Sequence, residues 1–256
     1  MNRLVTGIVT AAVLLGLWQA YVSISGIEAF LLPGPVAVMV TLFERFDLIM
    51  HHLGITALEI VLGLLIGTLL GVTSAILIHT IPVARRIGLP LLVISQAIPV
   101  FALAPLLVLW LGYDLWSKVA MAVLIIFFPV TTAFLDGLRR TDPGMMDLAS
   151  IMAATRSPLR RTISLLIHIR IPAALPALAS GLRVATGVAP IGAVVGEWVG
   201  SSAGLGFLML HANGRMQIDL LFAALFVLSL FSVLLWLSVD ALLRRALPWQ
   251  PDSFAK

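Results

Sequence analysis

The sequence predicts an all-α, polytopic membrane protein with about six transmembrane helices. Of the 256 residues, 61% are hydrophobic and only 11% are charged, which is too little charge to cover a water-soluble globule. The mean hydropathy is +1.11, and several apolar runs are long enough to cross a bilayer. The runs expected to span the membrane are residues 4–24, 53–78, 89–111, 119–135, 176–199 and 219–243.

The first run, residues 4–24, follows a single basic residue, Arg3. A secretory signal peptide has the same basic start and apolar core. Because the run is long for a signal core, and residues 23–26 make a poor cleavage site, we expect a retained first span. A Leu-Pro-Gly-Pro sequence at 32–35 then precedes an expected amphipathic surface helix over residues 36–50.

The second run contains three glycines spaced four residues apart, Gly63, Gly67 and Gly71. This spacing puts them on one face of a helix, where the missing side chains allow a neighbouring helix to approach closely. We therefore expect helix packing at these glycines in preference to a ligand site.

The third run is interrupted by three prolines, which free backbone carbonyl groups and bend a helix. Such a helix can line a pathway, to which Ser95 and Gln96 would contribute polar groups. A purely structural kink is the alternative. The fourth run ends before Arg139 and Arg140, after which the longest polar interruption of the chain begins.

This interruption, residues 147–183, contains five arginines, and its part before the expected fifth span is expected to lie outside the lipid. In its first part Leu148, Ile151, Met152 and Thr155 follow the i, i+3, i+4, i+7 spacing of one helical face. A short helix with one apolar face, placed outside the membrane, suits docking into a groove on another protein. A linker helix lying on the lipid headgroups is the alternative.

Four short motifs of this stretch resemble the EAA loop of permease subunits from binding-protein-dependent ABC importers: Asp-Leu-Ala at 147–149, Ala153, Ile-Pro-Ala-Ala-Leu-Pro at 171–176 and Gly-Leu-Arg at 181–183. In that family the loop forms a coupling helix in a cleft of the ATPase. The residues to which the resemblance gives this coupling role are Asp147, Leu148, Ala149, Ile151, Met152 and Ala153. Ala153 replaces the usual glycine, and the gap to Pro172 is longer than usual, so docking is expected over 147–153.

The end of the fifth run carries the sequence Gly-Ala-Val-Val-Gly-Glu-Trp-Val-Gly at 192–200, followed by Gly-Leu-Gly at 204–206. A carboxylate near the membrane is costly unless it faces water or a partner, so Glu197 is a candidate gate residue. Trp198 beside it offers a flat face for stacking a ring. A carboxylate that only pairs with Arg215 is the alternative.

Residues 190–225 resemble the permeases of thiamine-precursor (pyrimidine) importers, which belong to the sulfonate, taurine and nitrate permease group; riboflavin permeases are similar in the same region. The broader resemblance covers residues 30–245. It implies a type I ABC importer fold, with one transmembrane permease domain over 1–256, a core over 53–245 and a coupling loop over 144–172.

The basic residues are distributed unequally about the expected spans. When the first span starts inside, only Arg45, Lys118 and Arg215 of the 16 lysines and arginines lie on the outer side. By the positive-inside rule, both termini and the coupling loop are expected in the cytoplasm.

The sequence lacks the motifs for nucleotide binding, thiolate chemistry and metal binding. Neither of its two lysines follows a glycine, which excludes a G-x-x-x-x-G-K-[ST] nucleotide loop. Without cysteine it has no disulfide or thiolate site, and its five histidines form no H-x-x-x-H pair. We expect no metal, cofactor or catalytic residue in this chain, and no nucleic-acid partner, because the basic residues lie beside apolar spans.

These features together predict a permease subunit in the bacterial inner membrane that passes a hydroxymethylpyrimidine-like thiamine precursor. The resemblance implies a homodimer in the lipid, a cytoplasmic ATPase that binds ATP and Mg²⁺, and an external solute-binding protein. A permease for taurine, alkanesulfonate, nitrate or riboflavin is the alternative within the class. An ion-coupled carrier is disfavoured because most carboxylates lie near the expected span ends, and a membrane enzyme because no catalytic set is recognisable.

Overall fold

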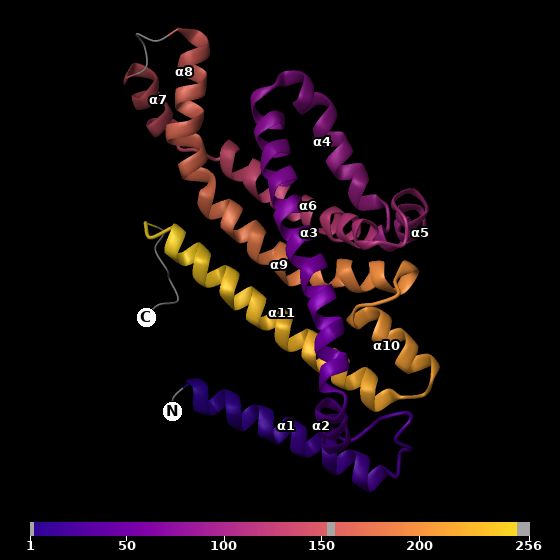
Figure 1. Ribbon diagram of the computed structural model, residues 1–256. Coiled ribbons are helices and arrows are strands. Elements are labelled where there is room, and N and C mark those ends of the chain that lie inside the picture. Colours follow the sequence, from indigo (N-terminus) through magenta and orange to yellow (C-terminus); the bar gives the residue numbers. More distant parts are fainter. Residues whose placement is uncertain (1–2, 153–156, 250–256) are drawn as a thin grey trace.

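The computed structural model describes residues 3–152 and 157–249, and within these ranges it is helical without any strand (Figure 1). The predicted all-α membrane architecture is confirmed. The elements in chain order are α1 (Arg3–Ser25), α2 (Pro35–Glu44), α3 (Phe46–Thr80), α4 (Pro82–Ala97), α5 (Val100–Leu111), α6 (Leu115–Arg139), α7 (Pro143–Met152), α8 (Pro158–Leu165), the π-helical turn η1 (Leu166–Arg170), α9 (Ile171–Gly200), α10 (Leu205–Gly214) and α11 (Ile218–Ala246).

Four helices of the described chain are long and apolar enough to cross a membrane. They are α3, α6, the continuous helix Arg160–Gly200, which consists of the larger part of α8 together with η1 and α9, and α11. The bent pair α4 and α5 makes a fifth span if it is counted as one. The expected first span is helical as α1, a helix of 23 residues, and the part of it described without a gap, Ala12–Ser25, is apolar.

The expected third span is not one kinked helix. It begins earlier, at Pro82, and α4 and α5 meet at an angle of 101°. The break falls at Ile98, whose backbone is extended (φ −88°, ψ 119°), because the ring of Pro99 disfavours a helical conformation in the residue before it. Pro90 and Pro105 lie inside α4 and α5 without breaking them.

The segment before the second span contains a surface helix, as expected, but its boundaries differ. α2 starts at Pro35, where the missing amide hydrogen is no loss at the first position of a helix. It ends at Glu44, and α3 begins only two residues later. α2 is tied to α11 because Thr41 Oγ1 donates a hydrogen bond to Asp219 Oδ2 at 2.7 Å.

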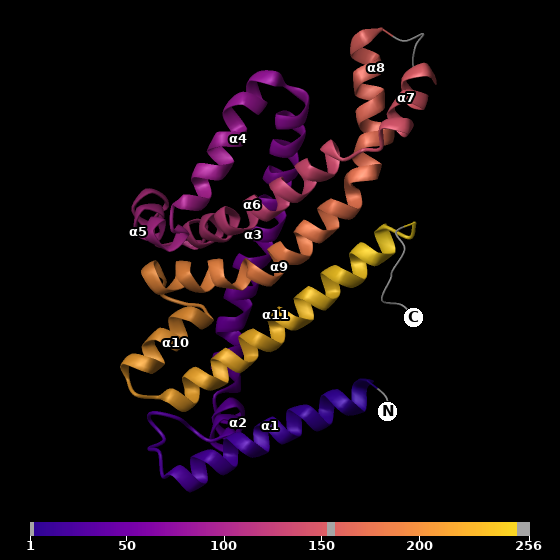
Figure 2. The ribbon, with the colours of Figure 1, turned by 180° about the vertical axis from the view of Figure 1, so that it is seen from behind.

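α3, α6 and α9 form the centre of the molecule, where α6 and α9 run side by side and α3 crosses both (Figures 1 and 2). Gly63, Gly67 and Gly71 lie on the face of α3 that contacts α6. A Cβ atom added at Gly67 would lie 2.8 Å from Ile126 Cγ2, and one at Gly71 would lie 2.8 Å from Val130 Cγ1. The glycine spacing therefore sets how closely the two helices approach.

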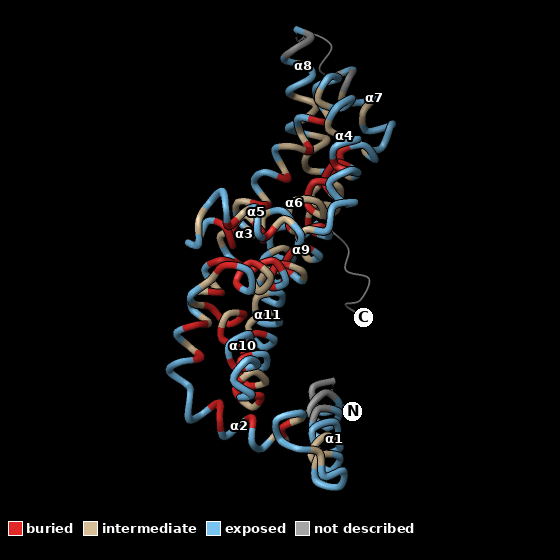
Figure 3. The backbone as a smooth tube through the Cα atoms, turned by 90° about the vertical axis from the view of Figure 1, so that its right-hand side faces the viewer, coloured by how far each residue is buried: buried red, intermediate tan, exposed pale blue. Residues whose placement is uncertain are grey.

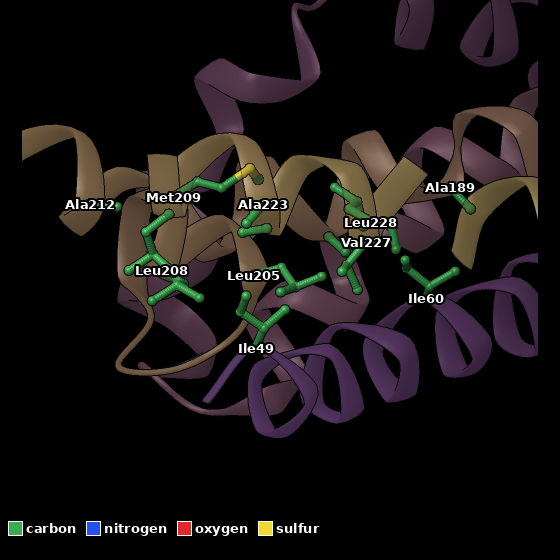
Figure 4. Packing of buried hydrophobic residues seen from close by; sticks show 14 of the residues in the cluster. Ile49, Ile60, Ala189, Leu205, Leu208, Met209, Ala212, Ala223, Val227 and Leu228 are labelled. Carbon is green, nitrogen blue, oxygen red and sulfur yellow. The ribbon is translucent and has the colours of Figure 1, made fainter. Parts of the chain in front are cut away.

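The apolar core has two parts. The larger one lies where α3, α9, α10 and α11 meet and includes Ile49, Ile60, Leu205 and Val227 (Figure 4). The smaller one joins α3, α4, α6 and α9 around Phe134. Outside these regions α1 and α7 are largely exposed (Figure 3). Large exposed apolar side chains over so much of the surface suit a protein that lies in lipid.

One buried acidic residue ties α9 to α11. Asp240, 7% exposed, accepts from Arg183 Nε at 2.6 Å through Oδ1 and from Arg244 Nε at 2.8 Å through Oδ2. Arg183 is the arginine of the Gly-Leu-Arg motif, so this motif has a structural role in joining the two helices.

Candidate functional site

Glu197 lies in the last turn of α9 and is buried, with only 1% of its surface exposed. Its Oε1 atom accepts a hydrogen bond from Thr56 Oγ1 at 2.6 Å. Its Oε2 atom accepts from the backbone amides of Gly206 and Phe207, the latter at 3.3 Å. The carboxyl group of α9 therefore lies at the N-terminus of α10, where a helix attracts negative charge.

The first amides of α10 are bound by side chains from other helices. The Gly204 amide donates to His52 Nδ1 at 2.9 Å, and the Leu205 amide donates to Thr56 Oγ1 at 2.7 Å. Since the Gly206 and Phe207 amides donate to Glu197, all four consecutive amides from Gly204 to Phe207 have an acceptor. These are the donors that a helix leaves without a partner inside itself, and α10 has no capping side chain of its own. α3 and α9 thus hold α10 in place through its N-terminus.

The Gly-Leu-Gly sequence is explained by this contact. Gly204 has φ +110°, a conformation that residues with a side chain rarely adopt, and a Cβ there would collide with the Glu197 carboxyl group. A Cβ at Gly206 would lie 2.8 Å from Glu197 Oε2. Both glycines let the backbone reach the carboxylate.

Two further ionisable side chains are buried beside Glu197. Glu59 and Lys118 are each 2% exposed. The Glu59 carboxyl group lies close to Glu197, and its Oε2 atom is buried without a hydrogen-bond partner. Lys118 Nζ donates to the Tyr113 and Asp114 carbonyl oxygens, the latter at 2.9 Å. We call His52, Thr56, Glu59, Lys118 and Glu197 the buried polar cluster.

The alternative role for Glu197, pairing with Arg215, is wrong for this structure. The oxygens of Glu197 bind Thr56 and the α10 amides, and Glu197 and Arg215, both described residues, form no ion pair with each other. Arg215 instead lines a separate hollow with Arg45. A gate role for Glu197 stays a prediction, and any such role would act through α10.

Trp198, the next residue, is 50% exposed. It borders a cavity of about 720 Å³ between α9, α10 and α11. The lining residues are Pro190, Ile191, Val194, Val195, Trp198, Met209, Leu210, Asn213, Leu221, Leu225 and Leu228. The surface is apolar except for the Asn213 amide and the indole nitrogen, and it holds no charged side chain.

The two polar candidates of the third run lie elsewhere. Ser95 and Gln96 are exposed near the end of α4, and Ser95 Oγ donates to the Leu92 carbonyl oxygen at 2.8 Å. Neither lines the Trp198 cavity. Within one chain the structure does not bring these two residues together with Glu197 and Trp198.

The predicted coupling segment forms α7, which projects with α8 at one end of the molecule (Figures 1 and 2). Asp142 Oδ1 starts the helix by accepting from the Gly144 and Met145 amides at 2.6 and 3.2 Å. Leu148 and Ile151 are 63% and 72% exposed. Asp147 is exposed and Ala149 half-buried on the same helix, Met152 is its last residue, and Ala153 lies outside the described residues.

Sequence reasoning missed most of the buried polar cluster. His52, Thr56 and Glu59 follow a spacing of four and three residues in an otherwise apolar run, which puts them on one helical face. That spacing was an available signal, since polar residues inside a membrane span need partners. In the described part of the chain, no group of three or more histidine or acidic residues could hold a metal ion.

Comparison with known proteins gives a family match over most of the chain. The model of the family described as "Binding-protein-dependent transport system inner membrane component" matches residues 63–249. A "Probable ABC transporter permease protein" of Haemophilus influenzae is 54% identical over 95% of this chain and 97% of its own length. The "Formylaminopyrimidine transport permease protein ThiX" of Halalkalibacterium halodurans is 36% identical, with 93% and 92% covered. The "Riboflavin transport system permease protein RibX" of Chloroflexus aurantiacus is also 36% identical, with 94% and 89% covered.

Proposed function

Because this chain belongs to the family of binding-protein-dependent transport system inner membrane components, we propose that it forms the membrane pathway of an importer for a thiamine-precursor pyrimidine. It is a multi-pass inner-membrane permease subunit of an ABC importer. Permeases of this family work with ATP-binding and solute-binding proteins and are not themselves catalytic. The partners of this chain would be a cytoplasmic ATPase that binds ATP and Mg²⁺ and an external solute-binding protein.

The cavity beside Trp198 is the observation that carries the substrate proposal. Its apolar lining, one half-exposed indole and one amide suit a flat, uncharged nitrogen heterocycle, which can stack on the indole and bond to Asn213. Taurine, sulfonates and nitrate carry a negative charge, and the cavity offers no cation to bind one. The relative named for formylaminopyrimidine transport supports the same class of substrate. The relative named for riboflavin makes that larger heterocycle the second candidate.

We further propose that two copies of the chain enclose the pathway, with both termini and α7 in the cytoplasm. The excess of arginines at the α7 end supports this orientation. ATP-driven closure of the ATPases would then move α7, and the movement would alternate the pathway between its two openings. Since the chain has no cysteine, single cysteines placed at Ser253 and Tyr113 can be labelled from each side to test the orientation.

Uptake of radiolabelled aminopyrimidine by cells that express the importer tests the substrate proposal. Trp198→Ala should reduce uptake roughly tenfold, since stacking on an aromatic ring contributes on the order of 1 kcal/mol beyond burial. Trp116→Ala is the matched control, because Trp116 is similarly exposed, at 57%, and lies outside the cavity.

Three competitors separate the candidate substrates. Competition by unlabelled pyrimidine alone would support the proposal. Competition by riboflavin, or importer-dependent uptake of labelled taurine without uptake of labelled pyrimidine, would assign the importer to that solute instead.

A further inference from the structure

A second polar region lies at the other end of α3, where α3, α4, α6 and η1 enclose a cavity of about 410 Å³. Its lining includes Arg85 from α4, Arg139 from α6, Arg170 from η1 and His79 from α3. We call it the arginine cavity. Three guanidinium groups from three elements, far apart in the sequence, converge on one space.

No acidic residue lines this cavity within the described ranges, and no described carboxylate forms an ion pair with the three arginines. The repulsion among three positive charges is therefore not balanced inside the described chain. Arg139 lies in the last turn of α6, where a cation is favourable, but Arg85 lies in the first turn of α4, which contains no acidic residue. The three guanidinium groups therefore favour an anion in this space.

The arrangement is held in part by His79. Arg170 Nη1 donates to His79 Nε2, and since a guanidinium group cannot accept a hydrogen bond, the ring nitrogen is the acceptor. His79 thus orients Arg170 at the cavity wall. The Thr141 side chain adds a hydroxyl group to the lining.

We propose that the arginine cavity binds the phosphate group of an anionic lipid. Guanidinium groups match phosphate oxygens in pairs, so three of them can hold one phosphate from several sides. The cavity lies where α3 ends at Thr80 and α6 ends at Arg139, and the ends of membrane spans lie at the level of the headgroups. Basic pockets between spanning helices at that level suit anionic headgroups. A soluble phosphate shares this chemistry and is the second possible source.

The full-length permease in neutral detergent, titrated with phosphatidylglycerol and measured by native mass spectrometry, tests the proposal. The wild type should retain one phosphatidylglycerol per chain, with phosphatidylcholine bound more weakly. The double variant Arg85→Gln/Arg139→Gln should bind phosphatidylglycerol at least roughly tenfold more weakly, because two charge-assisted contacts are lost. The matched control is Arg86→Gln/Arg140→Gln, which removes the same charge from adjacent positions outside this cavity and should stay within about twofold.

Further measurements identify the source of the bound phosphate group and test the alternatives to a lipid site. If inorganic phosphate displaces the lipid from the wild type, the site takes soluble phosphate as well. Equal weakening in both double variants, or in neither, would overturn the proposal. So would loss of the copurifying ATPase from Arg85→Gln/Arg139→Gln with lipid binding unchanged, because the cavity would then receive a protein side chain. If that variant unfolds, Arg139→Gln against Arg140→Gln gives the same comparison.

Discussion

The buried polar cluster and the arginine cavity lie on the same helix, α3, yet they handle charge in opposite ways. His52 belongs to the buried polar cluster and His79 to the arginine cavity, and the two are separated by about 40 Å along the helix. In the cluster, two carboxyl groups and one ammonium group are buried, and Glu197 and Lys118 are hydrogen-bonded to backbone groups of the protein. In the cavity, arginines line an open space with no acidic partner among the described residues.

This difference indicates a division of roles between the two ends. The cluster uses its polar groups to fix one element, α10, whose first four amides have their acceptors on α3 and α9. The other end leaves its polar and apolar groups available: the arginines for an anion, and the exposed Leu148 and Ile151 of α7 for a protein surface. Internal bonding at one end and exposed groups at the other fit the proposed movement of α7 by an ATPase.

We expect the largest loss of stability from a substitution that removes the hydrogen bonds of the buried polar cluster. Glu197→Ala leaves the Gly206 and Phe207 amides without their acceptor in a buried place, and the Thr56 hydroxyl group keeps only the His52 carbonyl oxygen at 3.3 Å. We expect the free energy of unfolding in detergent to fall by about 3 kcal/mol, because unsatisfied buried donors cost about 1–3 kcal/mol each. Thermal unfolding followed by tryptophan fluorescence measures it. Glu44→Ala, at an exposed glutamate, should leave the unfolding temperature unchanged, and equal values for the two variants would contradict the role of Glu197.

We expect a smaller loss of stability from a substitution between the two regions, where α3 contacts α6. Gly67→Leu introduces a side chain where even a Cβ would lie 2.8 Å from Ile126 Cγ2. The helices must separate, at a cost of about 1–3 kcal/mol, and the unfolding temperature should fall. Gly54→Leu on the same helix is the control, since a Cβ at Gly54 meets no atom within 4 Å. An unchanged unfolding temperature for Gly67→Leu would show that this contact does not set the helix spacing.

The smallest effect on stability is expected at α7. Leu148→Asp/Ile151→Asp changes two exposed side chains and should alter the free energy of unfolding by less than about 0.5 kcal/mol. The same variant should lose the ATPase, because burial of each apolar side chain in a partner groove is worth about 1.5–3 kcal/mol. Copurification of the complex measures this loss. Retention of the ATPase would show that α7 is not its docking helix.

The fold could be predicted from the sequence further than the site could. Apolar run length indicated the spanning helices, and the spacing of Gly63, Gly67 and Gly71 indicated a contact face, because both depend on local composition and helical period. The break at Ile98 was missed because a proline inside a run predicts a bend without its angle. The partner of Glu197 was missed because it is a set of backbone amides, which no residue type reveals, and because Thr56 lies 141 positions away in the chain.

Uptake of labelled aminopyrimidine by the Glu197→Gln variant tests most directly whether the buried polar cluster controls the pathway. Glutamine keeps the shape of the side chain and one acceptor oxygen but weakens the bonds to the α10 amides. With the permease and ATPase assembled in wild-type amounts, we expect uptake to fall roughly tenfold, as loss of a charge-assisted bond would predict. Uptake at the wild-type rate would contradict a role for Glu197 in gating and leave it a structural residue only.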